Sequence, residues 1–364
     1  LPGGRVRMGN RELLNLSAND YLGLAHDPRL IRASEEAAAR WGVGSGASRL
    51  ISGTLALHRE LEEEVAAWKK TPAALIFNAG YMANVGVIAA LLEPGGVILS
   101  DKLNHASIID GIRLSGAKFQ RFRHLDLQHL EELLRRVAGT SRILIITDSV
   151  FSVDGDLAPL KEMVELKERY GAWLMVDEAH ASGVFGPEGA GLAAALDLTE
   201  RIEVHLGTFS KALGSFGAYV AGSAPLIDYL CNRARAFIYS TALPPPVLGA
   251  NRAALQIIRQ EPEPRTYLLQ QAELFRQRLQ QAGFATLSSA SQIVPVLVGD
   301  NGLALEFAAR LREAGILAVA IRPPTVPPGT ARLRFSLSAV HPAADLEAAA
   351  ATIIACGRDL GLIP

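Results

Sequence analysis

Residues 172–180 read AWLMVDEAH, and residues 204–211 read VHLGTFSK. Each segment begins as a short apolar run and ends in polar residues, which is typical of a buried strand that reaches the edge of a parallel sheet. Further apolar runs alternate with stretches of helical period: the runs span residues 73–77, 97–99, 119–122, 143–147 and 218–221, and the helical stretches span 79–92, 125–137 and 159–170. This alternation predicts an α/β fold in which helices flank a mostly parallel sheet.

Three of the expected strands are followed by a polar residue, namely Asp148, Asp177 and Thr208. In a parallel sheet, ligands bind beyond the carboxyl ends of the strands. We therefore expect the functional site at this edge.

The alternation of short apolar runs and helical stretches ends at about residue 245, where Pro244-Pro245-Pro246 marks a break. A long polar helical pattern runs from there to Ala282, and the remainder predicts a smaller α/β unit. Its expected strands span 293–298, 317–321 and 332–338, and its expected helices span 304–314 and 344–358. We expect an N-terminal segment (1–40), a large domain (41–245), and a linking helix with a small C-terminal domain (246–364).

The composition narrows the function classes. The chain has 364 residues, of which 49% are hydrophobic and 20% are charged, and its net charge is −1. These values exclude a disordered chain and argue against a nucleic-acid partner, which usually calls for a basic excess.

Cys231 and Cys356 have no partners at metal-ligand spacing, so we expect no metal site and a reducing, cytoplasmic location. We expect no membrane span and no signal peptide. The chain begins at Leu1, which leaves open a preceding segment.

Two residues suggest a specific chemistry when they are taken together. Asp177 follows a wholly apolar strand and needs a cationic partner. Lys211 follows another strand in a loop of small residues, and desolvation lowers a lysine's pKa enough to make the amine a nucleophile. Alone, the first could cap a loop and the second could be a surface charge. Together they suit pyridoxal 5′-phosphate (PLP), which needs an amine for its aldehyde and a carboxylate for its ring nitrogen.

The sequence resembles the α-oxoamine synthases, a family of fold-type I PLP-dependent enzymes, from about Asn15 to its C-terminus. The segments that carry the resemblance are 177–180 (DEAH), 208–211 (TFSK), 101–107 (DKLNHAS), 150–156 (VFSVDGD) and 44–49 (GSGASR). Two more, 322–327 (RPPTVP) and 329–334 (GTARLR), resemble the member of the family that makes 8-amino-7-oxononanoate for biotin synthesis. The resemblance implies that the large domain binds PLP.

The resemblance also implies roles for single residues. Lys211 would condense with the cofactor aldehyde, Asp177 would pair with the ring nitrogen, His180 would bond the phenolic oxygen, and His105 would stack on the ring and meet the substrates. Ser152, Thr208, Gly80 and Tyr81 would complete the cofactor contacts, the last two at a helix N-terminus that suits a phosphate. Arg334 would hold the amino-acid carboxylate, with Thr325 and Asn19 near the substrates.

Each of these residues also has a plainer interpretation. His105 could be a core histidine, His180 a loop histidine, and Gly80 the end of a strand. Arg334, in an alternation with Arg332 and Ser336, could belong to a solvated strand face.

The implied activity is the decarboxylative condensation of L-alanine with pimeloyl-CoA or a pimeloyl carrier protein. Lys211, Asp177 and His105 would be the catalytic residues. The implied assembly is a homodimer with a shared active site, in which Ser240 and Thr241 reach the neighbouring subunit. Family members carry a further N-terminal segment with a basic residue that is thought to contact the acyl substrate, whereas about a dozen residues precede Asn15 here.

Several alternatives remain open at this stage. Related enzymes such as glycine C-acetyltransferase, 5-aminolevulinate synthase and serine palmitoyltransferase share the chemistry but use other amino acids and acyl chains. A different class is a non-catalytic PLP-fold sensor module, although this chain has no basic segment or room for a DNA-binding domain. A third is a scaffold with a vestigial cofactor pocket, against which the intact Lys211, Asp177 and His105 argue.

Overall fold

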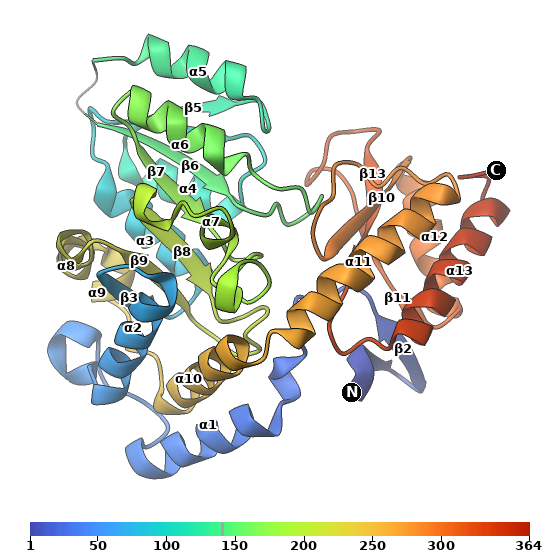
Figure 1. Ribbon diagram of the computed structural model, residues 1–364, viewed down its shortest axis with the longest axis horizontal. Coiled ribbons are helices and arrows are strands. Elements are labelled where there is room, and N and C mark those ends of the chain that lie inside the picture. The colour runs from blue at the N-terminus through green and yellow to red at the C-terminus, as the bar shows by residue number, and fades with distance from the viewer. Residues whose placement is uncertain (140–141) are drawn as a thin grey trace. The chain divides into compact units, whose positions relative to one another are not determined.

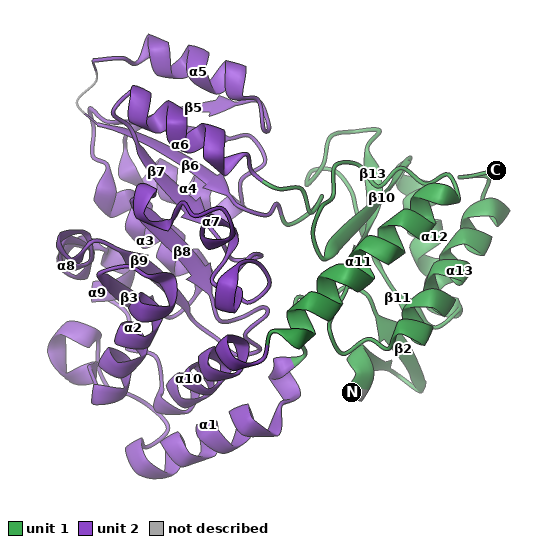
Figure 2. Cartoon of the chain, in the orientation of Figure 1, with its two compact units in different colours: residues 1–23, 152–157, 262–364 green, residues 24–151, 158–261 purple. Residues whose placement is uncertain are grey.

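The computed structural model describes residues 1–139 and 142–364. They form two compact units (Figures 1 and 2). Unit 1 comprises residues 1–23, 152–157 and 262–364, and unit 2 comprises the described residues of 24–151 and 158–261. The boundaries of these two units differ from those of the segments expected from the sequence, 1–40, 41–245 and 246–364. The three segments stay a prediction of domain organisation.

Unit 2 contains a seven-stranded sheet, counted over the described residues, in the order β3-β9-β8-β7-β6-β4-β5. Its strands are β3 (Ala73–Phe77), β4 (Val97–Asp101), β5 (Lys118–Phe122), β6 (Ile143–Asp148), β7 (Trp173–Asp177), β8 (Val204–Thr208) and β9 (Ala218–Gly222). Strands β4 to β8 pair in parallel, which confirms the predicted α/β class. β9 runs antiparallel to both β8 and β3, because the short β8–β9 loop has no room for the crossover that a parallel pair needs.

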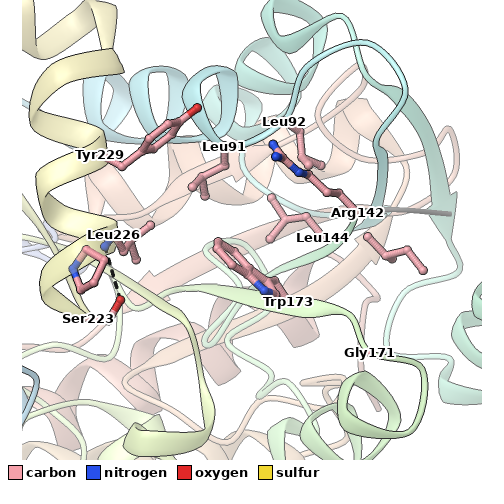
Figure 3. A pocket seen from close by; sticks show the side chains of 11 residues that line it. Leu91, Leu92, Arg142, Leu144, Gly171, Trp173, Ser223, Leu226 and Tyr229 are labelled. Carbon is pink, nitrogen blue, oxygen red and sulfur yellow. Dashed lines mark hydrogen bonds between the residues drawn. The ribbon is translucent and has the colours of Figure 1, made fainter.

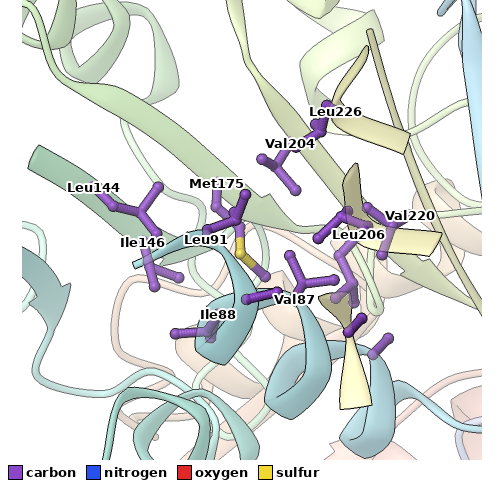
Figure 4. Close-up of a cluster of buried hydrophobic side chains, with 14 of the residues drawn as sticks. Val87, Ile88, Leu91, Leu144, Ile146, Met175, Val204, Leu206, Val220 and Leu226 are labelled. Atoms are coloured by element: carbon purple, nitrogen blue, oxygen red, sulfur yellow. The ribbon is translucent and has the colours of Figure 1, made fainter. Parts of the chain in front are cut away.

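Helices flank this sheet (Figure 1). They are α1 (Pro28–Trp41), α2 (Ala56–Lys69), α3 (Gly80–Leu91), α4 (Ala106–Ser115), α5 (Leu127–Arg136), α6 (Leu160–Arg169), α7 (Leu192–Ala195), α8 (Ala224–Arg233), α9 (Arg235–Ile238) and α10 (Pro245–Gln260). Figure 4 shows the apolar side of α3 with Val87 and Ile88, in one buried cluster with strand residues that include Met175. Side chains alternate along a strand, so Met175 and Asp177 share the side of β7 that faces α3, and Val176 and Glu178 share the other.

Unit 1 contains two three-stranded sheets within the described residues. One consists of β1 (Arg5–Met8), β2 (Arg11–Asn15) and β11 (Ile316–Leu317), and the other of β10 (Ile293–Gly299), β12 (Val319–Ile321) and β13 (Ala331–Ser336). Its helices are α11 (Glu263–Gln281), α12 (Asn301–Glu313) and α13 (Ala343–Asp359).

Two expectations about the second half of the chain are wrong. The helical pattern from 246 to 282 is two helices, α10 and α11, because Pro262 lies between them and has no amide hydrogen to continue the ladder. The expected strand 317–321 is split between β11 and β12, which pair in different sheets.

A pocket of about 560 Å³ lies at the amino ends of β6 and β7 (Figure 3). The apolar side chains of Leu144, Trp173 and Leu226 line this pocket, and so does Arg142. It is therefore at the opposite end of these strands from Asp148 and Asp177. Within the described ranges, the helices are too short or too polar to cross a bilayer.

Candidate active site

Lys211 lies in the loop that joins β8 to β9, and its Nζ is 2.9 Å from His180 Nε2. The loop turns sharply: the Gly214 amide donates to the Lys211 carbonyl at 2.9 Å. Gly214 has a φ of +65°, and a Cβ there would come within 2.4 Å of Ala25 N, so the turn requires glycine. Lys211 is half-buried and His180 is buried, so the surface-lysine alternative is wrong.

Asp177 is the last residue of β7, and it is buried. Asn84 Nδ2, from α3, donates to its Oδ2 at 2.7 Å, and the Ala179 amide donates to its Oδ1 at 2.9 Å. Each carboxylate oxygen therefore has one donor and keeps a lone pair for a further one.

Asp148 ends the neighbouring strand β6, directly beside Asp177 in register. Its Oδ2 accepts from the His105 amide at 2.9 Å. Burial raises the pKa of Asp148 well above its ordinary value, and the Asp177 charge adds to the shift. Burial at this strand end therefore disfavours the charged form of Asp148.

His105 is the N-cap of α4, where its Nδ1 lies 3.2 Å from the Ser107 amide and 2.7 Å from the Ser107 hydroxyl. Desolvation lowers the pKa of His105. The Asp177 charge raises this pKa and the Lys211 charge lowers it, each by less than the desolvation does. A neutral ring that accepts at Nδ1 carries its proton on Nε2 and can donate there. The residue as a whole is exposed and its ring contacts are partly buried, so His105 is not a core histidine.

Gly80 is the first residue of α3, and strand β3 ends three residues earlier, so Gly80 does not end a strand. The space above it is open: a Cβ would lie no closer than 3.9 Å to other heavy atoms, the nearest being those of Thr208. Thr208 is buried at the end of β8. Tyr81 is half exposed and bonds Asp110 Oδ2 at 2.6 Å, which directs its hydroxyl to α4.

Unit 2 thus holds the chemical groups that PLP requires. An amine beside an imidazole serves the aldehyde and phenolic oxygen, and a buried carboxylate with a vacant lone pair serves the ring nitrogen. The open N-terminus of α3 beside a threonine hydroxyl suits the phosphate. The residues present therefore fit the cofactor.

The predicted substrate residues and Ser152 lie in unit 1, where Arg334 brings several of them together. Arg334 Nε donates to the Ser152 carbonyl at 2.5 Å, and its Nη2 donates to Asn19 Oδ1 at 3.1 Å and to Tyr21 OH at 3.4 Å. Arg332 and Ser336, on the same face of β13, are buried. The solvated-face alternative is therefore wrong.

Two sets of predicted residues lie apart from these clusters. Thr325 is exposed in the loop between β12 and β13, and its amide donates to the Arg322 carbonyl at 3.0 Å. Thr241, which follows Ser240 in unit 2, forms an isolated β-bridge with Ser48. The Thr241 carbonyl also accepts a hydrogen bond from Asn78 Nδ2 at 2.7 Å. Their roles stay predictions.

The structure adds several residues, at the predicted site or next to it, for which the sequence predicted no role. Asn84 is the polar residue of an otherwise apolar, buried helix face, which was a usable signal. Tyr21 is fully buried beside Arg334, and burial raises the pKa of its phenol. Lys69 and Glu178 form a buried ion pair. Lys69 stood at an ordinary helix end in the sequence and gave no signal.

Comparisons with known proteins identify the family of the chain. The family "Aminotransferase class I and II" matches residues 11–353. The chain is 53% identical to the 8-amino-7-oxononanoate synthase of Geobacter sulfurreducens over 364 residues, 99% of this chain and 93% of that protein.

Two solved structures extend the comparison. Serine palmitoyltransferase from S. paucimobilis with a bound PLP–myriocin aldimine matches with a TM-score of 0.96 and 33% identity, covering 100% of this chain and 92% of that one. The 8-amino-7-oxononanoate synthase from Francisella tularensis matches with a TM-score of 0.83 and 28% identity, covering 94% of this chain and 97% of that one. The chain therefore belongs to the aminotransferase class I and II family and, within it, to the 8-amino-7-oxononanoate synthases.

Proposed function

We propose that this chain uses PLP to condense L-alanine with pimeloyl-CoA or a pimeloyl carrier protein, giving 8-amino-7-oxononanoate, CO₂ and the free thiol. This is a step of biotin biosynthesis. The observation that supports it most is the Lys211 amine 2.9 Å from His180 Nε2, at the sheet edge where Asp177 ends its strand. The 53% identity to a relative of that name supports the choice of substrates.

When bound, PLP supplies an aldehyde that condenses with amines and a cationic ring that withdraws electrons from the Cα carbon of the amino acid. Lys211 would hold the cofactor through its amine. The same Nζ would remove the Cα proton of L-alanine as a general base. His180, at 2.9 Å, orients that amine.

Asp177 would hold the proton on the ring nitrogen by ionic pairing. Its carboxylate is held by the Asn84 amide and the Ala179 backbone amide, so it is oriented before the cofactor arrives. Burial beside Asp177 raises the pKa of Asp148 and so disfavours a second negative charge at this point.

Arg334 and His105 act on the substrates in this proposal. The planar guanidinium of Arg334 binds the carboxylate of L-alanine through paired hydrogen bonds. His105 Nε2–H donates to the thioester oxygen as negative charge develops there, because Nδ1 is already engaged by Ser107.

A product assay tests the proposal. We expect 8-amino-7-oxononanoate and CO₂ from L-alanine with pimeloyl-CoA or pimeloyl carrier protein. Glycine or L-serine, with acetyl-, succinyl- or palmitoyl-CoA, should give at least about ten-fold lower kcat/KM, which corresponds to about 1.4 kcal/mol. Equal or better turnover with those substrates would contradict the assignment.

One observation favours a second candidate. The match to serine palmitoyltransferase has a TM-score of 0.96 and 33% identity, against 0.83 and 28% for the Francisella tularensis synthase. L-serine with palmitoyl-CoA is therefore the comparison that matters most in the assay.

Replacing Arg334 by lysine should raise KM for L-alanine about 10- to 100-fold, because a charged, paired hydrogen bond contributes about 1.5–3 kcal/mol and an ammonium cannot reproduce the fork. PLP affinity should stay unchanged. The matched control is Arg332→Lys, two residues earlier on the same face of β13, which keeps its ion pair with Asp154. An unchanged KM in Arg334→Lys would remove this residue from the substrate site.

The assembly is also part of the proposal. We infer a homodimer that covers an apolar surface of unit 2, where Ile51 is 81% exposed and Tyr239 is 71% exposed. The bridge between Ser48 and Thr241 ties these two segments together, so that Ser240 and Thr241 belong to the surface that a second copy would meet. A cytoplasmic location stays a prediction.

A further inference from the structure

On the opposite side of β7 from Asp177, unit 2 buries an ion pair that the reaction does not use. Lys69 ends α2, Glu178 follows β7, and their side chains are 1% and 0% exposed. Lys69 Nζ donates to Glu178 Oε2 and to the Ala190 carbonyl. The other carboxylate oxygen accepts from the Ala193 amide at 2.9 Å. Both charged groups thus have hydrogen-bond partners inside the unit.

The surroundings of this pair are neutral and closely packed. His205 Nδ1 lies 4.0 Å from Glu178 Oε2, and burial lowers the pKa of His205 to about 4, so the ring is uncharged at neutral pH. Burial and the Glu178 charge raise the pKa of Tyr219, which keeps the phenol neutral. At Gly191, where φ is +109°, a Cβ would come within 2.4 Å of Glu178 Oε1. The carboxylate therefore has a fixed position.

Glu178 fixes the backbone that carries two predicted site residues. Its amide donates to the Leu206 carbonyl at 2.7 Å, and its carbonyl accepts from the amides of Ala181 at 3.0 Å and Ser182 at 2.8 Å. Asp177 precedes it and His180 follows two residues later. The turn is thus held by β8 and by its own hydrogen bonds as well as by the ion pair.

The two faces of the strand end are held by different helices. Asp177 faces α3 and accepts from Asn84, and Glu178 faces α2 and pairs with Lys69. A buried ion pair contributes little net stability compared with apolar residues of the same size, but it fixes geometry because either partner alone is strongly disfavoured. Positional restraint is therefore the property that this pair supplies.

We propose that Lys69 and Glu178 are a positioning pair that orients Asp177 for the ring nitrogen of PLP and His180 for Lys211, without touching cofactor or substrate. This inference rests on the proposed function. It assigns a role to residues more than one hundred positions apart in the chain.

The test compares three variants of the full chain. Lys69→Met removes the cation, and Lys69→Met/Glu178→Gln removes both charges, so that no unpaired charge stays buried and folding is protected. Lys167→Met is the matched control, because it breaks the Lys167–Glu203 pair at the amino end of the same strand, where Glu203 also accepts from the Leu174 amide at 2.8 Å. PLP is titrated into each apo chain, and the pH midpoint of the visible absorption band is measured with the melting temperature.

We expect both Lys69 variants to bind PLP about 10- to 100-fold more weakly and to shift the midpoint, as loss of a supporting contact does at other cofactor sites. Lys167→Met should lower only the melting temperature. Wild-type PLP affinity and midpoint in the Lys69 variants would overturn the proposal. Failure of both to fold, while Lys167→Met folds, would assign the pair to folding and overturn it too. A wild-type chain that binds PLP but makes no product from L-alanine would overturn the proposed function instead.

Discussion

Lys211→Ala is expected to lower turnover by about 10⁴-fold or more, because it removes the amine that holds the cofactor and the base that takes the Cα proton. PLP should still bind through Asp177, His180 and the N-terminus of α3, although without a covalent bond. The measurement is product formation from L-alanine and pimeloyl-CoA at saturating PLP, together with the visible spectrum.

The control for this variant is Lys161→Ala, at the exposed start of α6. It removes an amine from unit 2 without touching the strand ends, so its activity should equal that of the wild type. Turnover by Lys211→Ala at a rate near that of the control would contradict the proposed role of the amine.

Asp177→Asn should lower kcat by about 10²–10³-fold and weaken PLP binding, because an uncharged amide cannot secure the proton of the ring nitrogen. The structure makes this mainly a test of charge, since asparagine has nearly the same shape and can still accept from the Ala179 amide. Its Nδ2 cannot accept from Asn84, which has to turn its amide so that its own oxygen accepts from that group. The readouts are kcat and the PLP dissociation constant.

Asp101→Asn separates this role from simple capping of a strand end. Asp101 ends β4, is fully buried, and accepts from the amides of Leu103 at 2.8 Å and Leu125 at 2.9 Å. Its replacement should lower the melting temperature and leave the PLP dissociation constant unchanged. If the two variants lost stability equally and both kept their PLP affinity, Asp177 would be no more than a cap.

The sheet of unit 2 was predictable because its strands are strongly apolar and its helices carry a clear period. The alternation placed Asp148, Asp177 and Thr208 at the carboxyl ends of β6, β7 and β8, and the structure confirms it. The direction of β9 was not predictable in this way, since an apolar run gives no strand direction.

The contacts that complete the site depend on pairings between distant parts of the chain. Asn84 meets Asp177 across 93 positions, and Lys69 meets Glu178 across 109. Strand β1 alternates charged and apolar residues, whereas β2 begins with adjacent Arg11 and Glu12 and is paired by β11 from the other end of the chain. Local propensity carries no information on such pairings.

The central claim is that the amine of Lys211 forms the covalent bond to PLP. Borohydride reduction of the yellow holoenzyme, followed by proteolysis and mass spectrometry, tests it most directly. We predict a single pyridoxyl-phosphate adduct on the peptide that contains Lys211, and its loss when L-alanine is added before the reductant. An adduct on another lysine, or a colourless protein that borohydride does not label, would contradict the claim.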